Sequence, residues 1–346
     1  MQAILLVVGA GAIFVFGLEA VGGWNAMTAK LSASQMSLIK PTGDDFLPWP
    51  GLLGVVLLGF YYWTLNQFVV QRTLGARDLD QGRKGALLAG LLKLPNLFIM
   101  ILLGVFGILL FPNLDNPDLV FPVLASELLP VGFRGLILTA LIAAIMSSLD
   151  SALNAAATLV SVDFVKEARP DIDDDTLVKV GRSFTAFAMV VGALYAPSIR
   201  GFENLFEYFQ SVLAYVTPPI VSVFVVGIFW KRANRHGGFW AIVSGLVVGV
   251  GLFLATEVFG LWTALGWPSP HFTYVAIAMF VFGTGVLAGV SLATAPPDYG
   301  RIAEYTLTRE VFERDLRAPE LPWYEDFRYQ VVTVVALMTG VIVYFW

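Results

Sequence analysis

The stretch GLILTALIAAIMSSLDSALNAAATLVS, residues 135–161, decides the fold class. It is apolar over more than the roughly 20 residues that a helix needs to cross the hydrocarbon core of a bilayer. Its one charged residue is Asp150, which lies among hydroxyl and amide side chains. The stretch therefore predicts a membrane-spanning helix that carries a polar stripe, and the rest of the chain repeats its apolar character.

Composition excludes several classes of protein. Of the 346 residues, 57% are hydrophobic and 14% charged, and the mean hydropathy is +0.76, so a soluble single-domain enzyme is excluded. The chain has no cysteine, which rules out disulfides and thiolate sites. Its two histidines, His236 and His271, stand far apart, which argues against a catalytic zinc site. The formal charge of -5, without any basic block, argues against nucleic-acid binding.

Apolar runs of membrane length recur along the whole chain. They cover residues 3–18, 52–71, 85–111, 135–161, 178–198, 205–230, 238–259, 271–294 and 330–346. The sequence therefore predicts an all-α polytopic membrane protein with about nine transmembrane helices. Pro218 and Pro219 indicate local unwinding in one span, and the glycines of 240–251 indicate close helix packing.

The basic residues give the orientation. If the first run ends outside, the inner connections are 72–84, 162–182, 231–236 and 295–329, and they hold 16 of the 21 Lys and Arg residues. The outer connections hold four: Lys30, Lys40, Arg134 and Arg200. Because cytoplasmic loops carry the excess of positive charge, this count predicts which loops face inward.

The polar stripe of 143–163 is the first candidate site. Four small residues lie at i, i+3, i+4 and i+7 and so share one helix face: Ala144, Ser147, Ser148 and Ser151. Asp150 and Asn154 form an adjoining polar line. Hydroxyl and carbonyl oxygens suit a hard cation such as sodium. The alternative interpretation is close helix packing through small residues, although packing alone does not require a carboxylate.

An aromatic and amide cluster is the second candidate. Tyr61, Tyr62 and Trp63 precede Asn66 and Gln67 at a depth nearer the middle of the membrane than its interface. Aromatic rings there can stack on the apolar face of a sugar while amides bond its hydroxyls. A core aromatic cluster is the alternative, and Arg72 is interpreted as an anchor at the inner interface.

Three further residues stand out. Lys93 lies in an apolar run before Pro95, so it either snorkels to the inner interface or places its ammonium in a polar cavity. Gln210 makes either a bond between helices or a contact to solute, and Phe206 lies one turn earlier on the same face.

Three long stretches resemble the sodium/solute symporter family, in particular its sodium/glucose cotransporter branch. They are YYWTLNQFVVQRTLGARDLDQGRKG from Tyr61, PVGFRGLILTALIAAIMSSLDSALNAAATLVSVDF from Pro130, and YFQSVLAYVTPPIVSVFVVGIFWKRANRHGGFW from Tyr208. The resemblance implies a transporter fold with two inverted five-helix repeats, here incomplete and lacking most of the first repeat. It assigns residues 1–25 to the last helix of the first repeat, 52–230 to the second repeat, and 231–346 to three additional helices with an inner loop at 295–329.

The resemblance also implies roles for single residues. Sodium ligands carry over to the Ala144 carbonyl and the hydroxyls of Ser147 and Ser148, and Asp150 matches a position linked to a second sodium. Sugar contacts carry over to Tyr62, Trp63, Lys93 and Gln210, and Phe206 matches a residue of the outer gate.

The function that follows is sodium-coupled symport of a glucose-like sugar by alternating access, in the plasma (inner) membrane and as part of a longer protein. Sodium is the coupling ion, no organic cofactor or enzyme activity is implied, and the partners are a small solute and the lipid bilayer, with no nucleic acid. Two alternatives stay open: a sodium symporter for a carboxylate or an amino acid, and a membrane fragment without transport activity.

Overall fold

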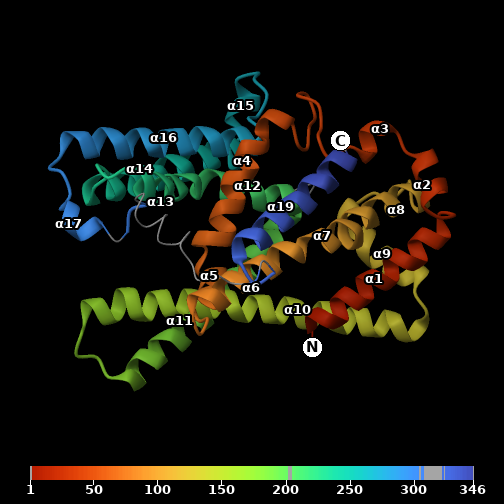
Figure 1. Ribbon diagram of the computed structural model, residues 1–346, viewed down its shortest axis with the longest axis horizontal. Coiled ribbons are helices and arrows are strands. Elements are labelled where there is room, and N and C mark those ends of the chain that lie inside the picture. Colours follow the sequence, from red (N-terminus) through yellow and green to blue (C-terminus); the bar gives the residue numbers. More distant parts are fainter. Residues whose placement is uncertain (1, 202–204, 304, 308–321, 323, 346) are drawn as a thin grey trace. The chain divides into compact units, whose positions relative to one another are not determined.

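The computed structural model describes residues 2–201, 205–303, 305–307, 322 and 324–345, and this part of the chain is helical with no β-sheet (Figure 1). Six helical stretches are long and apolar enough to cross a membrane: 79–110, 131–166, 174–195, 235–258, 272–293 and 327–344. Three bent helix pairs raise the number of spans among the described residues to as many as nine. Each span lies within a few residues of a predicted apolar run, so the predicted fold class is confirmed.

The three bent pairs mark where spans are interrupted. They are Ile4–Ala20 with Trp24–Lys30, bent by 72°; Trp49–Leu65 with Gln67–Leu74, bent by 48°; and Leu205–Val216 with Pro218–Phe229, bent by 52°. The last bend lies at Pro218, as the proline pair predicts, because a proline lacks the N–H that would continue the helix. The bend at Asn66 has no proline or glycine, and the sequence did not predict it.

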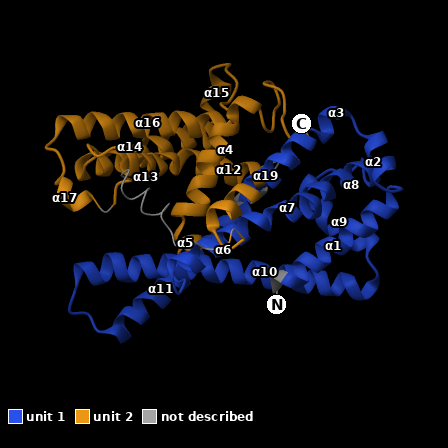
Figure 2. Ribbon diagram, viewed as in Figure 1, with its two compact units in different colours: residues 1–37, 71–205, 334–344 blue, residues 38–70, 206–333, 345–346 orange. Residues whose placement is uncertain are grey.

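The described chain divides into two compact units (Figure 2). Unit 1 comprises residues 1–37, 71–205 and 334–344, and unit 2 comprises residues 38–70, 206–333 and 345–346. The second repeat expected over 52–230 contributes residues to both units, and its assignment as a repeat stays a prediction. Much of the expected inner loop 295–329 lies outside the described residues; its described part includes the short helix α17 (Tyr299–Ile302).

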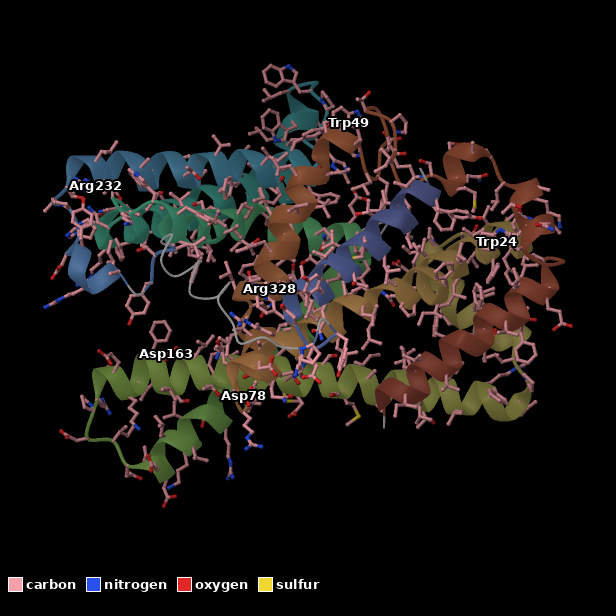
Figure 3. The ribbon with its side chains drawn as sticks, in the orientation of Figure 1. Trp24, Trp49, Asp78, Asp163, Arg232 and Arg328 are labelled. Carbon is pink, nitrogen blue, oxygen red and sulfur yellow. The ribbon has the colours of Figure 1, made fainter. Side chains whose placement is uncertain are left out.

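Unit 1 is built around the longest helix. Its helices are α1 (Gln2–Ala20), α2 (Trp24–Lys30), α3 (Ala33–Met36), α6 (Leu79–Leu91), α7 (Lys93–Asn96), α8 (Leu102–Leu110), α9 (Val120–Leu128), α10 (Val131–Thr158), α11 (Asp174–Tyr195) and most of α19 (Phe327–Tyr344). Helix α10 continues through a wide π-helical segment, η5 (Leu159–Lys166), in which Asp163 lies (Figure 3). The core of the unit joins α1 to α8 and α9 through the buried residues Ile13, Phe106 and Leu124.

Unit 2 holds α4 (Leu52–Phe60), α13 (Pro218–Phe229), α14 (Arg235–Phe253), α15 (Leu261–Ala264) and α16 (Phe272–Ala293), together with most of α12 (Leu205–Val216). Helix α16 packs against α13, α14 and α4. The buried residues of α14 are all small and recur every fourth position: Gly237, Ala241, Gly245 and Gly249. This stripe confirms the predicted close packing, because small residues let helix backbones approach each other.

Three helices that begin on the predicted inner side are capped by carboxylate or amide side chains. Asp78 accepts the N–H of Gln81 at 2.8 Å, Asp173 accepts that of Thr176 at 2.9 Å, and Asn234 accepts that of Gly237 at 2.9 Å. Such caps satisfy N–H groups that have no partner within the helix. Asp78 precedes α6, and Arg232 lies in the turn before α14 (Figure 3).

The cap at Asp173 predicts a pH dependence. Hydrogen bonds from the Thr176 hydroxyl and N–H hold the pKa of the Asp173 carboxyl below its ordinary value of 3.8. A lowered pKa means that the carboxylate stabilises the start of α11 above about pH 4, and that this stability is lost as pH falls through the lowered pKa. Amide hydrogen exchange over the first turn of α11, corrected for its intrinsic pH dependence, should therefore accelerate in that range. Asp173→Asn keeps a capping oxygen and should remove the pH dependence; an unchanged pH profile in this variant would contradict the assignment.

Candidate functional site

The break at Asn66 interrupts a membrane span next to the aromatic cluster. The π-helical turn η2 (Tyr61–Leu65) ends there, and Asn66 is extended, with φ −71° and ψ 116°. Its side-chain oxygen accepts the N–H of Phe68 at 3.2 Å, and its carbonyl accepts that of Val70 at 2.9 Å, so Asn66 starts α5 (Gln67–Leu74). Wide turns and interrupted helices are frequent at functional sites, since they leave main-chain groups available to a ligand.

Tyr62 is packed between two aromatic rings from either side of this break. Its ring centroid lies 5.1 Å from that of Trp63 and 6.1 Å from that of Phe68, with both pairs edge to face. Tyr62 is partly buried, and Trp63 keeps 47% of its surface exposed. Tyr62, Trp63 and Phe68 together are called the aromatic corner. In it the Tyr62 ring is held in place and the Trp63 ring is exposed, which gives a surface suited to the apolar face of a small molecule.

Helix α12 carries two further residues of the predicted solute site and gate, Phe206 and Gln210. Phe206, in its first turn, is 53% exposed, and Gln210, one turn further, is half-buried. Tyr208 and Ser211 on the opposite side are buried. The helix thus turns Phe206 away from the core of its unit.

The polar stripe lies on α10 in unit 1, as predicted. Ser147, Ser148 and Asp150 are exposed, and Ala144 is half-buried. The helix around them belongs to a span of 36 residues with a mean hydropathy of 1.9. Polar side chains exposed on such a span require a partner or a task, because lipid offers no hydrogen bonds.

Arg72 makes a contact to this stripe that the sequence did not predict. Its Nη2 donates a hydrogen bond to Ser151 Oγ at 2.7 Å, and Ser151 in turn donates to the Ser147 carbonyl at 2.9 Å. Ser151 is thereby held against the helix, while the Ser147 and Ser148 hydroxyls stay exposed. Interpreting Arg72 only as an interfacial anchor was therefore incomplete; its bond to Ser151 links positions 79 residues apart, which no local pattern reveals.

Lys93 opens the short helix α7 and is exposed. Leu79–Leu110 is one span of 32 residues, so Lys93 lies well inside an apolar segment. It belongs to unit 1, with the α10 stripe, whereas Tyr62, Trp63, Phe206 and Gln210 belong to unit 2. Within the described residues no group of three or more His, Cys, Asp or Glu side chains could hold a metal ion.

Comparisons with known proteins agree with this architecture. Residues 1–245 match the model of the sodium:solute symporter family. The human sodium/myo-inositol cotransporter 2 is 31% identical over 370 residues, covering 93% of this chain and 55% of the relative. The sodium/glucose cotransporter 1 of Oryctolagus cuniculus is 31% identical over 349 residues, covering 86% of this chain and 53% of the relative.

A solved structure shares the fold. It is the substrate-bound, outward-open state of a Na+-coupled sialic acid symporter, with a TM-score of 0.64 and 21% identity, covering 86% of this chain and 62% of that one. The chain spans about half the length of the curated relatives it matches.

Proposed function

Because the chain belongs to the sodium:solute symporter family, we propose that it forms part of a transporter that couples sodium entry to uptake of a glucose-like sugar across the plasma membrane. Sodium binds at the Ala144 carbonyl and the Ser147 and Ser148 hydroxyls, favours the outward-open state and orders the solute site. The membrane potential supplies about 2.3 kcal/mol per charge for each 100 mV, to which the sodium gradient adds. No covalent chemistry is required.

The observation that carries this proposal is the pair of exposed hydroxyls at Ser147 and Ser148 on an otherwise apolar span. A helix-packing role would bury them, as it buries Ser222 of α13, which is fully inaccessible. Sodium prefers oxygen ligands and binds in related folds to hydroxyl and main-chain oxygens from helices. Asp150, also exposed on α10, supplies negative charge for a second cation.

The aromatic corner supports a sugar as the solute. The Trp63 ring, 47% exposed beside the fixed Tyr62 ring, offers a face to the C–H groups of a pyranose, and the amide of Gln210 offers hydrogen bonds to its hydroxyls. The names of the relatives point to the same chemistry, since they are cotransporters of myo-inositol, glucose and, for one of Bos taurus, mannose.

A sugar that carries a carboxylate is the second candidate. Lys93 places an ammonium within an apolar span, and an ammonium favours an anionic solute. The solved structure with the same fold is a symporter of sialic acid, which is such a solute.

Uptake into proteoliposomes tests both proposals. The complete gene product is reconstituted, an inward sodium gradient is imposed, and entry of labelled glucose is measured against a potassium gradient and a sodium ionophore. Glucose entry that is indifferent to sodium would refute the coupling. Unlabelled myo-inositol, mannose, sialic acid and an amino acid then serve as competitors; competition by sialic acid without competition by neutral sugars would favour the second candidate over the first.

Tyr62 gives a sharper test of the solute site. Tyr62→Ala should raise the half-saturating sugar concentration at least tenfold, because a lost aromatic packing face removes roughly 1.5–3 kcal/mol of apolar contact. Tyr62→Phe keeps the ring and should stay within about threefold of the unsubstituted protein. The half-saturating sodium concentration should change less than that of sugar, and equal changes in both would contradict a direct contact between Tyr62 and the sugar.

A further inference from the structure

The outer loop between α3 and α4 is a folded structure that exposes two aromatic side chains, Phe46 and Trp49. The N–H of Leu38 donates to the Phe345 carbonyl at 2.8 Å, and Lys40 and Pro48 form a β-bridge that closes the loop. Trp49 then begins the turn η1 (Trp49–Gly51) that leads into α4 (Figure 3). The positive-inside count assigns this loop to the outer side.

Asp44 shapes the tip of this loop. Its Oδ1 accepts the N–H of Phe46 at 3.0 Å and that of Leu47 at 2.8 Å. Such a turn fixes the backbone on both sides of the Phe46 side chain. Pro48, two residues further on, is buried, so the direction of the loop beyond Phe46 is fixed as well.

The ring of Phe46, whose backbone Asp44 holds in place, packs against the ring of Phe206. The two centroids lie 5.9 Å apart with an interplanar angle of 35°, in the range of favourable aromatic pairs. Phe46 is 47% exposed and Phe206 53% exposed, so neither ring is needed to fill the core of unit 2. An apolar pair that remains this exposed gains stability when a further movement covers it.

We propose that Phe46 is a positioning residue of the outer gate: it holds the Phe206 ring across the outer end of the solute path and so stabilises the closed state. This inference rests on the proposed function, which treats Phe206 as a gate residue, and it adds a partner from a loop to which no role has been assigned. The physical basis is that the Phe46 ring provides a surface against which the Phe206 ring packs when the gate closes.

The test is a double-mutant cycle on sodium-driven sugar uptake by the complete gene product. Phe46→Ala should raise the half-saturating sugar concentration about 2- to 10-fold, the range expected when an aromatic pair that stabilises a closed state is lost. The maximal rate should stay within about twofold. Phe46→Trp or Phe46→Tyr should restore the unsubstituted value, and Phe46→Leu should not. The variant Phe46→Ala/Phe206→Ala should be no worse than Phe206→Ala alone.

Phe209 provides the matched control. Phe209 lies on α12, as Phe206 does, and is exposed to a similar extent, at 51%. Because the gate proposal gives Phe46 no role at Phe209, the effects of Phe46→Ala and Phe209→Ala should multiply. Cross-linking gives a second readout, in a complete gene product from which any cysteine outside this chain has been replaced: cysteines placed at positions 46 and 206 should be joined by a short cleavable thiol cross-linker, and cleavage should restore uptake.

The outcomes separate the two proposals. Suppose that the unsubstituted protein shows sodium-driven uptake. If the effects of Phe46→Ala and Phe206→Ala then multiply, or if no cross-link forms, the gate role of Phe46 is overturned and the proposed function stands. Absence of sodium-driven uptake in the unsubstituted protein overturns the proposed function and the gate with it.

Discussion

Replacing Ser148 by alanine should lower the apparent sodium affinity of uptake by about 10- to 100-fold. A bond between a neutral hydroxyl and a full charge contributes roughly 1.5–3 kcal/mol, and the apolar span around Ser148 offers no water as a substitute. Uptake measured over a series of sodium concentrations at saturating sugar gives the shift directly. Ser147→Ala should have an effect of the same size, because its hydroxyl is exposed on the same helix face.

The control for this prediction lies on the same helix. Thr139 is exposed, and its hydroxyl donates to the Gly135 carbonyl at 2.8 Å, so its oxygen is engaged within its own helix. Thr139→Ala should therefore leave the sodium dependence unchanged. If Ser148→Ala behaves like Thr139→Ala, the hydroxyl stripe is a packing surface, which is the alternative that the sequence leaves open.

Gly249→Ala should cause a large loss of stability. A Cβ at this position would clash with the Tyr215 carbonyl oxygen, which belongs to the backbone of α12 and cannot rotate away. Overpacking a closely packed interior typically costs 1–3 kcal/mol, and about 3 kcal/mol or more is expected where backbone must move. Thermal unfolding of the purified protein in detergent measures the loss, and uptake should fall as well, because α12 carries Gln210 and Phe206.

Gly251 gives the opposite expectation on the same helix. No heavy atom lies within 4 Å of a Cβ built there, so the only effect of Gly251→Ala is the better helix propensity of alanine, about 0.5–1 kcal/mol in favour of the folded state. A fall in the unfolding temperature of Gly251→Ala that equals that of Gly249→Ala would show that glycine is needed for a reason other than close packing.

Much of the fold could be predicted from local patterns. A run of about 20 apolar residues predicts a span wherever it occurs, because the thickness of the bilayer sets the length of a helix. The glycines of 240–251 predict close helix packing, and the structure buries the small residues at every fourth position of 237–249, which share one side of the helix. The face with Ser147, Ser148 and Ser151 follows from the same periodicity.

Other features depend on contacts that the sequence does not show. The break at Asn66 has no proline or glycine within the turn 61–67, so no local signal marks it. Assigning Arg72 to the inner interface explains its charge but not its bond to Ser151, because that bond depends on how two separate helices cross.

The amino-acid sequence is sufficient to identify an all-helical membrane protein of the sodium:solute symporter family and to show which helix faces are polar. The helical class and the polar faces depend on the number and spacing of apolar residues within single spans, whereas the family is recognised by its resemblance over three long stretches of sequence. Three contacts become visible only in the folded protein: Arg72 bonds to Ser151, Phe46 packs against Phe206, and Gly249 lies against Tyr215. Each of these pairs joins residues distant in the chain, and their meeting is set by packing between helices and loops, for which helical periodicity carries no information.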